Sequence, residues 1–221
     1  MNPRQPAIDA MRPALQDTAN RLALDVSASQ LDALLDYLAL LQRWNATYNL
    51  TAVREPQQML THHLADCLAV VAPLRRQAGT DPLRLLDVGS GGGLPGAVIA
   101  LLNPGTDVTC VDTVGKKTAF VQQVAGELRL PNLRARHARV EQMTAEPYEV
   151  VASRAFASLA DFTRLTCQHL AVSGVWMAMK GKPPTDEIAK LPANIEVFHV
   201  EQLDVPGLDA ERCLVWMRPK R

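Results

Sequence analysis

Apolar residues recur with two different periods along this chain. Between Ser27 and Trp44 leucines return every three or four positions, and Ser27 or Ser29 stands where a helix N-cap is expected. A second helical pattern follows Pro56, with one apolar face made of Met59, Leu60, His63, Leu64, Cys67 and Leu68. These patterns predict a helical appendage without strands over residues 1–76.

The pattern changes at residue 84, where short apolar or β-branched runs begin to alternate with helical stretches. The runs that predict strands are RLLDVG, VTCVD, LRARH, YEVVAS, GVWMAMKG, IEVFHVEQL and RCLVWMRP. The stretches that predict helices are LPGAVIALL, GKKTAFVQQVAGELRL and SLADFTRLTCQHL, with Ser158 as a candidate cap. Strands alternating with helices over residues 77–221 predict an α/β domain whose parallel sheet is covered on both faces.

Composition agrees with a folded globular protein. The chain has 221 residues, of which 48% are hydrophobic and 21% charged. No apolar run approaches the roughly 18 residues of a membrane span, and the first 15 residues lack the features of a signal peptide. The four cysteines are far apart and form no CxxC pair, which favours reduced thiols, a cytoplasmic location and no zinc site. No pattern indicates an oligomeric state.

Charge is balanced overall but unevenly distributed. The net charge is zero, yet residues 116–182 contain 10 Lys or Arg against 5 Asp or Glu. A basic segment of this kind suits a nucleic-acid partner, and it equally suits a solvated face. Charge alone leaves the two interpretations even.

The segment LLDVGSGGGLPG carries the first chemistry, because it follows the first predicted strand. Open α/β sheets bind ligands beyond the carboxyl ends of their strands, where strand order reverses. Gly91, Gly93 and Gly96 fit the dinucleotide pattern GxGxxG, which is a weak match alone. The same segment also fits an Asp-x-Gly-x-Gly-x-Gly pattern that begins with Asp87 and Gly89. An acid there suits a ligand with an ammonium group, such as S-adenosylmethionine (SAM), with Asp87 orienting either the loop or that group.

Two further strand ends complete a nucleoside site. Asp112 ends the second predicted strand, where a carboxylate can accept hydrogen bonds from both ribose hydroxyls. After the third strand, backbone groups around Val140 and Glu141 could bind an adenine edge. Glu141 is equally compatible with an ordinary acid at the start of a helix.

The fourth strand ends in Ser153-Arg154-Ala155-Phe156. Enzymes that methylate exocyclic amines often carry an Asn/Asp-Pro-Pro-Tyr/Phe loop at this point, so that reaction is disfavoured. Arg154 next to Phe156 suits a purine held by stacking and guided by a cation. The structural alternative is a core role for Phe156 and an acidic partner for Arg154.

Taken together, the motifs of the chain resemble those of the RsmG family of bacterial ribosomal RNA methyltransferases, also called glucose-inhibited division protein B. The similarity covers roughly residues 30–182. It rests on the pieces WN, YNLTAV, HLAD, DVGSG, GLPG, GKK, RVE, SRAFASL and KG in this order. Small departures are Cys67, where a serine is common, and Thr113-Val114 before GKK. Nothing is transferred to the last 39 residues, because they contain none of these motifs.

The resemblance implies a class I SAM-dependent methyltransferase with a mostly parallel seven-stranded, Rossmann-like sheet. It implies methylation of N7 of guanine 527 in the 530 loop of 16S rRNA, with the 30S subunit as partner and SAM as cofactor. The family's cofactor site falls on Gly89, Leu94, Val140, Glu141 and Arg154 of this sequence. With Asp87, Gly91, Gly93 and Asp112, these are the expected cofactor residues.

Methylation at N7 has consequences for the catalytic residues. N7 carries a lone pair and loses no proton, so no general base is needed, and we expect Arg154 to act by positioning. Expected RNA contacts are Lys116, Lys117, Phe156, Lys180 and Lys182. His63 is expected to pack with Asp66 near the cofactor, and no metal is expected.

Two functions of other classes compete with this interpretation. An NAD(P)-linked oxidoreductase would use the GxGxxG pattern, but no proton-relay residue accompanies it. A non-catalytic RNA-binding module would use the basic segment, but it would not need Asp87, the glycines and Asp112 together.

Overall fold

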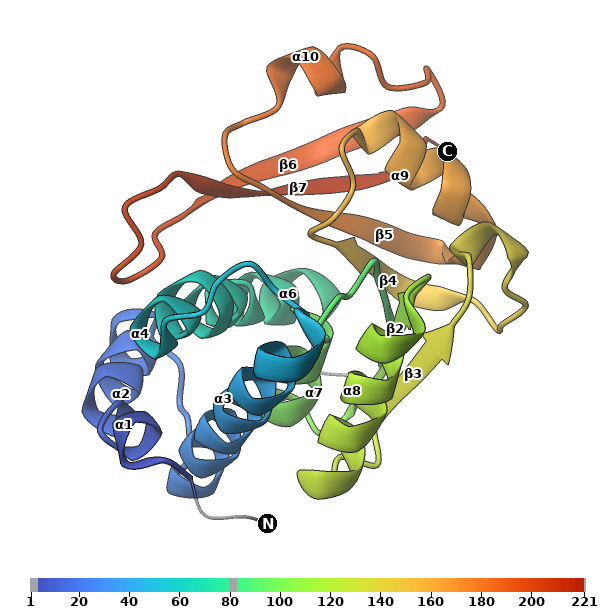
Figure 1. The fold of residues 1–221 in the computed structure, drawn as a ribbon. Coiled ribbons are helices and arrows are strands. Elements are labelled where there is room, and N and C mark those ends of the chain that lie inside the picture. The colour runs from blue at the N-terminus through green and yellow to red at the C-terminus, as the bar shows by residue number, and fades with distance from the viewer. Residues whose placement is uncertain (1–3, 80–82, 221) are drawn as a thin grey trace.

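The computed structural model describes residues 4–79 and 83–220. Its centre is one seven-stranded sheet in the order β3-β2-β1-β4-β5-β7-β6 (Figure 1). The strands are β1 Leu83–Val88, β2 Thr106–Asp112, β3 Leu133–His137, β4 Tyr148–Ser153, β5 Leu170–Lys180, β6 Ile195–Leu203 and β7 Arg212–Pro219. Strands β1 to β5 pair in parallel, whereas β7 is antiparallel to both β5 and β6. The predicted α/β fold class, mostly parallel and seven-stranded, is confirmed.

Successive side chains of each strand enter two separate hydrophobic cores. Leu85 and Val108 face one core, while the adjacent Leu86 and the neighbouring strand's Val111 face the other. The first core is covered by α3 Ala28–Tyr48, α7 Gly96–Leu102 and α8 Gly115–Glu127. The second is covered by α9 Leu159–Thr166, the 3-10 helix η3 Cys167–His169 and α10 Thr185–Ile188. The sheet is therefore buried on both faces, as predicted.

The N-terminal helices pack on the helices α7 and α8 that cover one face of the sheet. They are α1 Pro6–Asp9, α2 Arg12–Arg21, α3, α4 Pro56–Met59, the π-helix η1 Leu60–Ala65, α5 Asp66–Leu68 and α6 Val71–Ala78. Ser27 caps α3 through a capping box with Gln30. Tyr37 of α3 meets Phe120 of α8 edge-on, with ring centroids 6.0 Å apart. One core thus continues across residues 76 and 77, and the domain boundary there stays a prediction.

Several elements differ in extent from their predicted form. The helix predicted after Pro56 is interrupted by the π-helix, although its predicted apolar face is buried. Strand β5 begins four residues before GVWMAMK, and α9 ends at Thr166. The connection from β3 to β4 contains only the 3-10 helix η2 Val140–Gln142. This short connection leaves the ends of β1 and β2 accessible beside it.

Two general expectations can be compared with the described residues. None of their helices combines the length and the apolar character needed to cross a membrane. Within residues 4–79 and 83–220, no three His, Cys, Asp or Glu side chains gather as metal ligands would. All four cysteines are free, and Cys167 alone among them is exposed.

Candidate functional site

Three adjoining cavities lie at the carboxyl ends of the parallel strands. The first, of about 380 Å³, lies beyond β1, β2 and β3. The second, of about 240 Å³, lies against the glycine loop, and the third, of about 350 Å³, lies beyond β4 and β5. Gly89 and Ala155 line both the first and the second cavity, while His63 and Arg154 line both the second and the third. The cavities therefore form a continuous row along this edge of the sheet.

The glycine loop between β1 and α7 borders the second cavity. Gly91 has a φ of +58°, and a Cβ built on it would meet no atom within 4 Å. Its N–H donates to Asp112 Oδ2 at 2.9 Å. A Cβ on Gly96 would instead lie 2.6 Å from Cys110 Sγ, so this glycine lets α7 pack on the sheet. The loop thus exposes its backbone at Gly91 and buries it at Gly96.

Asp87 is fully buried beneath this loop. Its Oδ2 accepts a hydrogen bond from the Gly96 N–H at 2.9 Å, while Oδ1 has no partner among the described residues. Burial raises the pKa of this carboxyl to about 7. Of the two predicted roles, this position supports orienting the loop rather than contacting an ammonium group.

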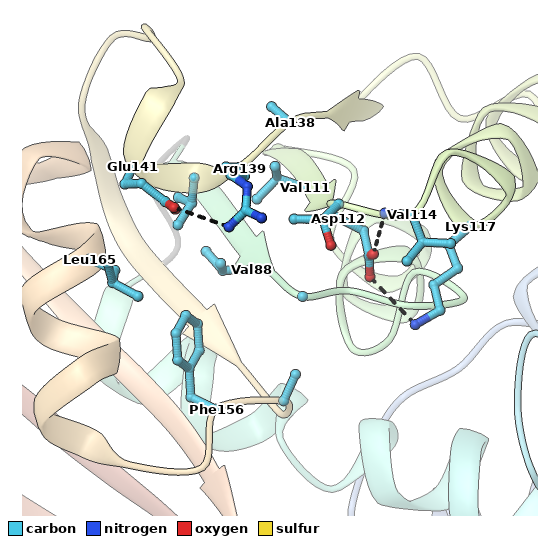
Figure 2. Close-up of a pocket in the computed structure, with 14 residues that line it drawn as sticks. Val88, Val111, Asp112, Val114, Lys117, Ala138, Arg139, Glu141, Phe156 and Leu165 are labelled. Atoms are coloured by element: carbon cyan, nitrogen blue, oxygen red, sulfur yellow. Dashed lines mark hydrogen bonds and ion pairs between the residues drawn. The ribbon is translucent and has the colours of Figure 1, made fainter.

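Asp112 lines the first cavity and holds two loops in place. Its Oδ2 accepts the Gly91 N–H and its Oδ1 accepts the Val114 N–H, each at 2.9 Å. Lys117 Nζ lies 3.9 Å from Oδ2 (Figure 2). Each carboxylate oxygen keeps a second lone pair for a ribose hydroxyl. Asp112 is therefore placed where the sequence predicted a ribose contact, and Lys117 belongs to the same cavity.

The opposite side of the first cavity is apolar. Figure 2 shows Phe156 and Leu165 across from Asp112, with Arg139 between them. Phe156 packs on Phe162 of α9 with ring centroids 5.2 Å apart. Phe156 is therefore half-buried in the lining of this cavity, and its predicted RNA contact stays a prediction.

Val140 and Glu141 line the same cavity from η2. The Val140 carbonyl is 2.7 Å from His169 Nε2, which fixes this turn on α9's side of the sheet. Glu141 lies in the first turn of η2, with Oε1 3.7 Å from Arg139 Nη1. Both residues are thus available to the base of a bound nucleoside, and the helix-start alternative for Glu141 also holds.

The N-terminal helices supply the far wall of the second cavity. This wall consists of Leu41, Leu50, Thr51 and His63, opposite Leu94 and the glycines. The Tyr37 hydroxyl donates to the Gly92 carbonyl at 2.7 Å, which ties α3 to the loop. His63 Nε2 lies 3.0 Å from Thr51 Oγ1. Burial, assisted by Arg154, lowers the pKa of His63 to about 4, so this imidazole is neutral near pH 7.

Arg154 separates the second cavity from the third and has an acidic partner. Its Nη1 donates to Asp66 Oδ2 at 3.1 Å and to the His62 carbonyl at 3.3 Å. The other oxygen of Asp66 accepts Arg212 Nε at 2.9 Å. The sequence left an acidic partner for Arg154 open, and the structure identifies it as Asp66. Sequence reasoning missed Arg212, the first residue of β7.

The four predicted RNA-contacting lysines lie in different surroundings. Lys116 is exposed and donates to the Tyr48 carbonyl at 2.6 Å, and Lys182 is 85% exposed. Lys180 is only 13% exposed, and its ammonium group binds the Phe156 carbonyl and both oxygens of Glu187. Since these acceptors occupy its three N–H groups, the structure argues against the predicted phosphate contact of Lys180.

Comparison with known proteins places this geometry in a family. The family described as GidB, rRNA small subunit methyltransferase G, matches residues 30–215. The chain belongs to this RsmG family. It is 65% identical over 209 residues to the ribosomal RNA small subunit methyltransferase G of Leptothrix cholodnii, covering 95% of this chain and 96% of that protein. The protein of the same name from an Acidovorax species is 63% identical, with 93% and 94% covered.

Solved structures show the same fold at low sequence identity. The 1,6-didemethyltoxoflavin N1-methyltransferase of Burkholderia thailandensis, with bound S-adenosylhomocysteine, matches with a TM-score of 0.59 and 16% identity over 84% of this chain and 90% of that one. Magnesium protoporphyrin IX methyltransferase from Synechocystis, with bound SAM, also has a TM-score of 0.59 and 16% identity, covering 83% and 97%. The class I methyltransferase fold is therefore confirmed.

Family and fold together settle the class of reaction. The RsmG protein described here is a SAM-dependent methyltransferase that acts on ribosomal RNA. This excludes the oxidoreductase and the non-catalytic module as alternatives. The family match also extends past residue 182 to residue 215, so the C-terminal strands belong to the family as well.

Proposed function

We propose that this RsmG protein transfers the methyl group of SAM to N7 of guanine 527 in the 530 loop of 16S rRNA. The 30S subunit is the proposed partner and the cytoplasm the proposed location. Support comes first from the relatives at 65% and 63% identity, both named ribosomal RNA small subunit methyltransferase G. The chemistry of the second and third cavities supplies the atomic detail.

Two cavities of the row suit different parts of SAM. Adenosine suits the first cavity, where Asp112 faces the ribose and Val140 and Glu141 face the base. The amino-acid part suits the second cavity, along the exposed backbone of Gly91. Arg154 donates from Nη1 to Asp66, and within the described residues no acceptor binds its Nε or Nη2, so it can bind the carboxylate of this part. When bound, SAM supplies an electrophilic methyl group on its sulfonium.

The observation that carries the choice of N7 is the kind of side chain around the second and third cavities. His63 has its pKa lowered to about 4 by burial, and Arg154 is a permanent cation. Neither of these two side chains, which line both cavities, is poised to remove a proton near pH 7, and the carboxylate of Asp66 is bound on each oxygen by an arginine. A nucleophile with an accessible lone pair and no proton to lose fits such a site, and guanine N7 is one.

Methyl transfer to 30S subunits that lack the modification tests the proposal. Labelled SAM, the wild-type protein and either these subunits or naked 16S rRNA are incubated, and the labelled base is mapped. We expect one labelled guanine, at N7 of position 527. A label on N2, on O6 or on an adenine would overturn the proposal.

The pH dependence of turnover tests the absence of a general base. At saturating SAM, we expect a flat profile between pH 6 and 8.5 once RNA binding and protein stability are accounted for. A bell-shaped profile would report an essential acid and base, in contradiction to the N7 mechanism.

A further inference from the structure

The third cavity is built from four separate stretches of the chain. The π-helix and α5 supply His62, His63 and Asp66, the β4 end supplies Arg154, the β5 end supplies Met179, Lys180 and Gly181, and β7 supplies Arg212. The lining contains the cations Arg154, Lys180 and Arg212 and the carboxylate Asp66; the two arginines bind Asp66, and Lys180 binds Glu187. At about 350 Å³ the cavity has the size of a small-molecule site. Its lining therefore suits an electron-rich, hydrogen-bond-accepting group.

Asp66 fixes the two arginines of this cavity. The carboxylate is 2% exposed, and each of its oxygens binds one guanidinium, Arg154 at 3.1 Å and Arg212 at 2.9 Å. Arg212 also donates from Nη1 to the Glu211 carbonyl at 2.8 Å. Within the described residues, no acceptor binds Arg212 Nη2. One donor of a firmly held guanidinium thus remains for a ligand.

The third cavity adjoins the expected position of the methyl group. The sulfur of SAM joins its adenosine to its amino-acid part, so the methyl group lies where the first and second cavities meet. Gly89 and Ala155 line both of these cavities, and Ala155 directly follows Arg154. Arg154 in turn lines the third cavity. A base in the third cavity would therefore approach the methyl group from beyond the β4 end.

We propose that the third cavity receives the target guanine after it leaves the base stack, and that Arg212 determines specificity by donating to O6. This inference rests on the proposed function. Enzymes that modify a base inside structured RNA or DNA extrude it into such a pocket. Guanine presents two acceptors, O6 and N7, on one edge, whereas adenine presents an amino donor in place of O6. A donor from Arg212 to O6 selects guanine and leaves N7 open to the methyl group.

The variant Arg212→Met tests this assignment, with Arg218→Met as its matched control. Arg218 lies on the same strand and also binds a carboxylate, Glu196, but lines none of the three cavities described here. We expect Arg212→Met to lower kcat/KM for unmodified 30S subunits roughly 10- to 100-fold. The Kd for SAM should stay within about twofold of wild type. Arg218→Met should leave both quantities unchanged.

Three results would overturn the assignment. Equal kcat/KM values for the two variants would remove Arg212 from the substrate site. A SAM affinity that falls by the same factor as turnover would show that Arg212 acts only through Asp66 and Arg154. The third result is a fall in kcat/KM together with a salt dependence of RNA binding that is shallower by about one ion. It would show that Arg212 contacts a phosphate instead of a base.

The variant Arg212→Lys keeps a positive charge beside Asp66. It therefore tests the assignment even if Arg212→Met fails to fold. A lysine ammonium cannot hold Asp66 and O6 in the same fork geometry, so we expect an intermediate loss of turnover at wild-type melting temperature. Full activity would contradict the assignment. If the proposed function itself were wrong, the wild-type protein would label a different atom, which the mapping experiment detects without any variant.

Discussion

The second and third cavities meet at Arg154 but are lined by different kinds of chemical group. The second cavity is lined largely by the backbone of the glycine loop, including the exposed Gly91, and by the apolar side chains Leu41, Leu50 and Leu94. The third is formed by charged side chains, with Asp66 between Arg154 and Arg212. Backbone recognises a ligand by shape and close approach, whereas the charged cluster recognises it by hydrogen-bonding pattern. The cofactor side should therefore respond to added bulk and the RNA side to lost donors.

The largest effect is expected from Gly91→Val. Valine is strained at the φ of +58°, and its side chain would extend into the second cavity. We expect the Kd for SAM to rise by on the order of 100-fold or more in isothermal titration calorimetry. Gly105→Val is the control, because Gly105 also has open space around it but no positive φ. Wild-type SAM binding by a folded Gly91→Val protein would contradict the backbone role.

Asp112→Ala tests the side chain that supports this backbone. The change removes the acceptor of the Gly91 and Val114 amides as well as the proposed ribose contact. We expect SAM affinity to fall roughly 10- to 100-fold, the scale of hydrogen bonds to a charged group. Asp112→Asn should lose less, because it keeps one acceptor. Asp107→Ala on the outer part of β2 should bind SAM normally, and an equal loss there would point to general damage to the strand.

Arg154→Lys affects both cavities at once. The change keeps the charge but removes the planar fork that reaches Asp66 and the second cavity. We expect turnover to fall about tenfold with an unchanged circular dichroism spectrum. The surface pair member Arg164→Lys serves as the control. Full activity of Arg154→Lys would reduce its role to that of a generic cation.

The pH dependence of stability tests Asp87. Burial raises its pKa to about 7, above the ~3.9 of an unfolded aspartate. Its contribution to stability is therefore complete below the unfolded pKa and is lost as the pH rises through 7. We expect the contribution of Asp87 to make the wild-type Tm fall between about pH 4 and 7 and to level off above that, and Asp87→Asn to show a smaller fall. Asp107→Asn should keep the wild-type slope; identical slopes for all three proteins would argue against a perturbed Asp87.

Lys116→Ala should produce the smallest change. Lys116 is exposed at the start of α8, outside the cavity linings. We expect RNA binding to weaken a few-fold and its salt dependence to become shallower by about one ion, with SAM affinity unchanged. Lys190→Ala, two positions after the end of α10, should leave the salt dependence as in wild type. If Lys116→Ala does the same, the basic segment around Lys116 is a solvated face.

Sequence patterns predicted the features that depend on near neighbours. The glycine loop, Asp112 at a strand end, and the caps Ser27 and Ser158 each involve contacts within a few residues or a standard strand-end position. The order of strands and helices followed from the same local periodicity. Local rules suffice there because backbone geometry and the edge of a parallel sheet determine where these groups lie.

Distant side-chain contacts were not predictable in this way. Asp66 and Arg212 are 146 positions apart, and no spacing rule relates them. Arg212 reaches the site because β7 is antiparallel to β5, which brings the start of β7 beside Lys180. The mostly parallel pattern gave no signal for that reversal. Phe156 was assigned to RNA from its place beside Arg154 in the sequence. Its packing on Phe162 could not be predicted, because it depends on the position of α9.

The hydrogen bond from Tyr37 to Gly92 has a consequence for synthesis of the chain. Tyr37 precedes Gly92 by 55 positions, so α3 leaves the ribosome before the loop that it holds. The loop carbonyl gains its buried partner only after α3 has docked on α7 and α8. The N-terminal helices thus help to set the conformation of the glycine loop. A protein that lacks these helices would lose the conformation of that loop as well.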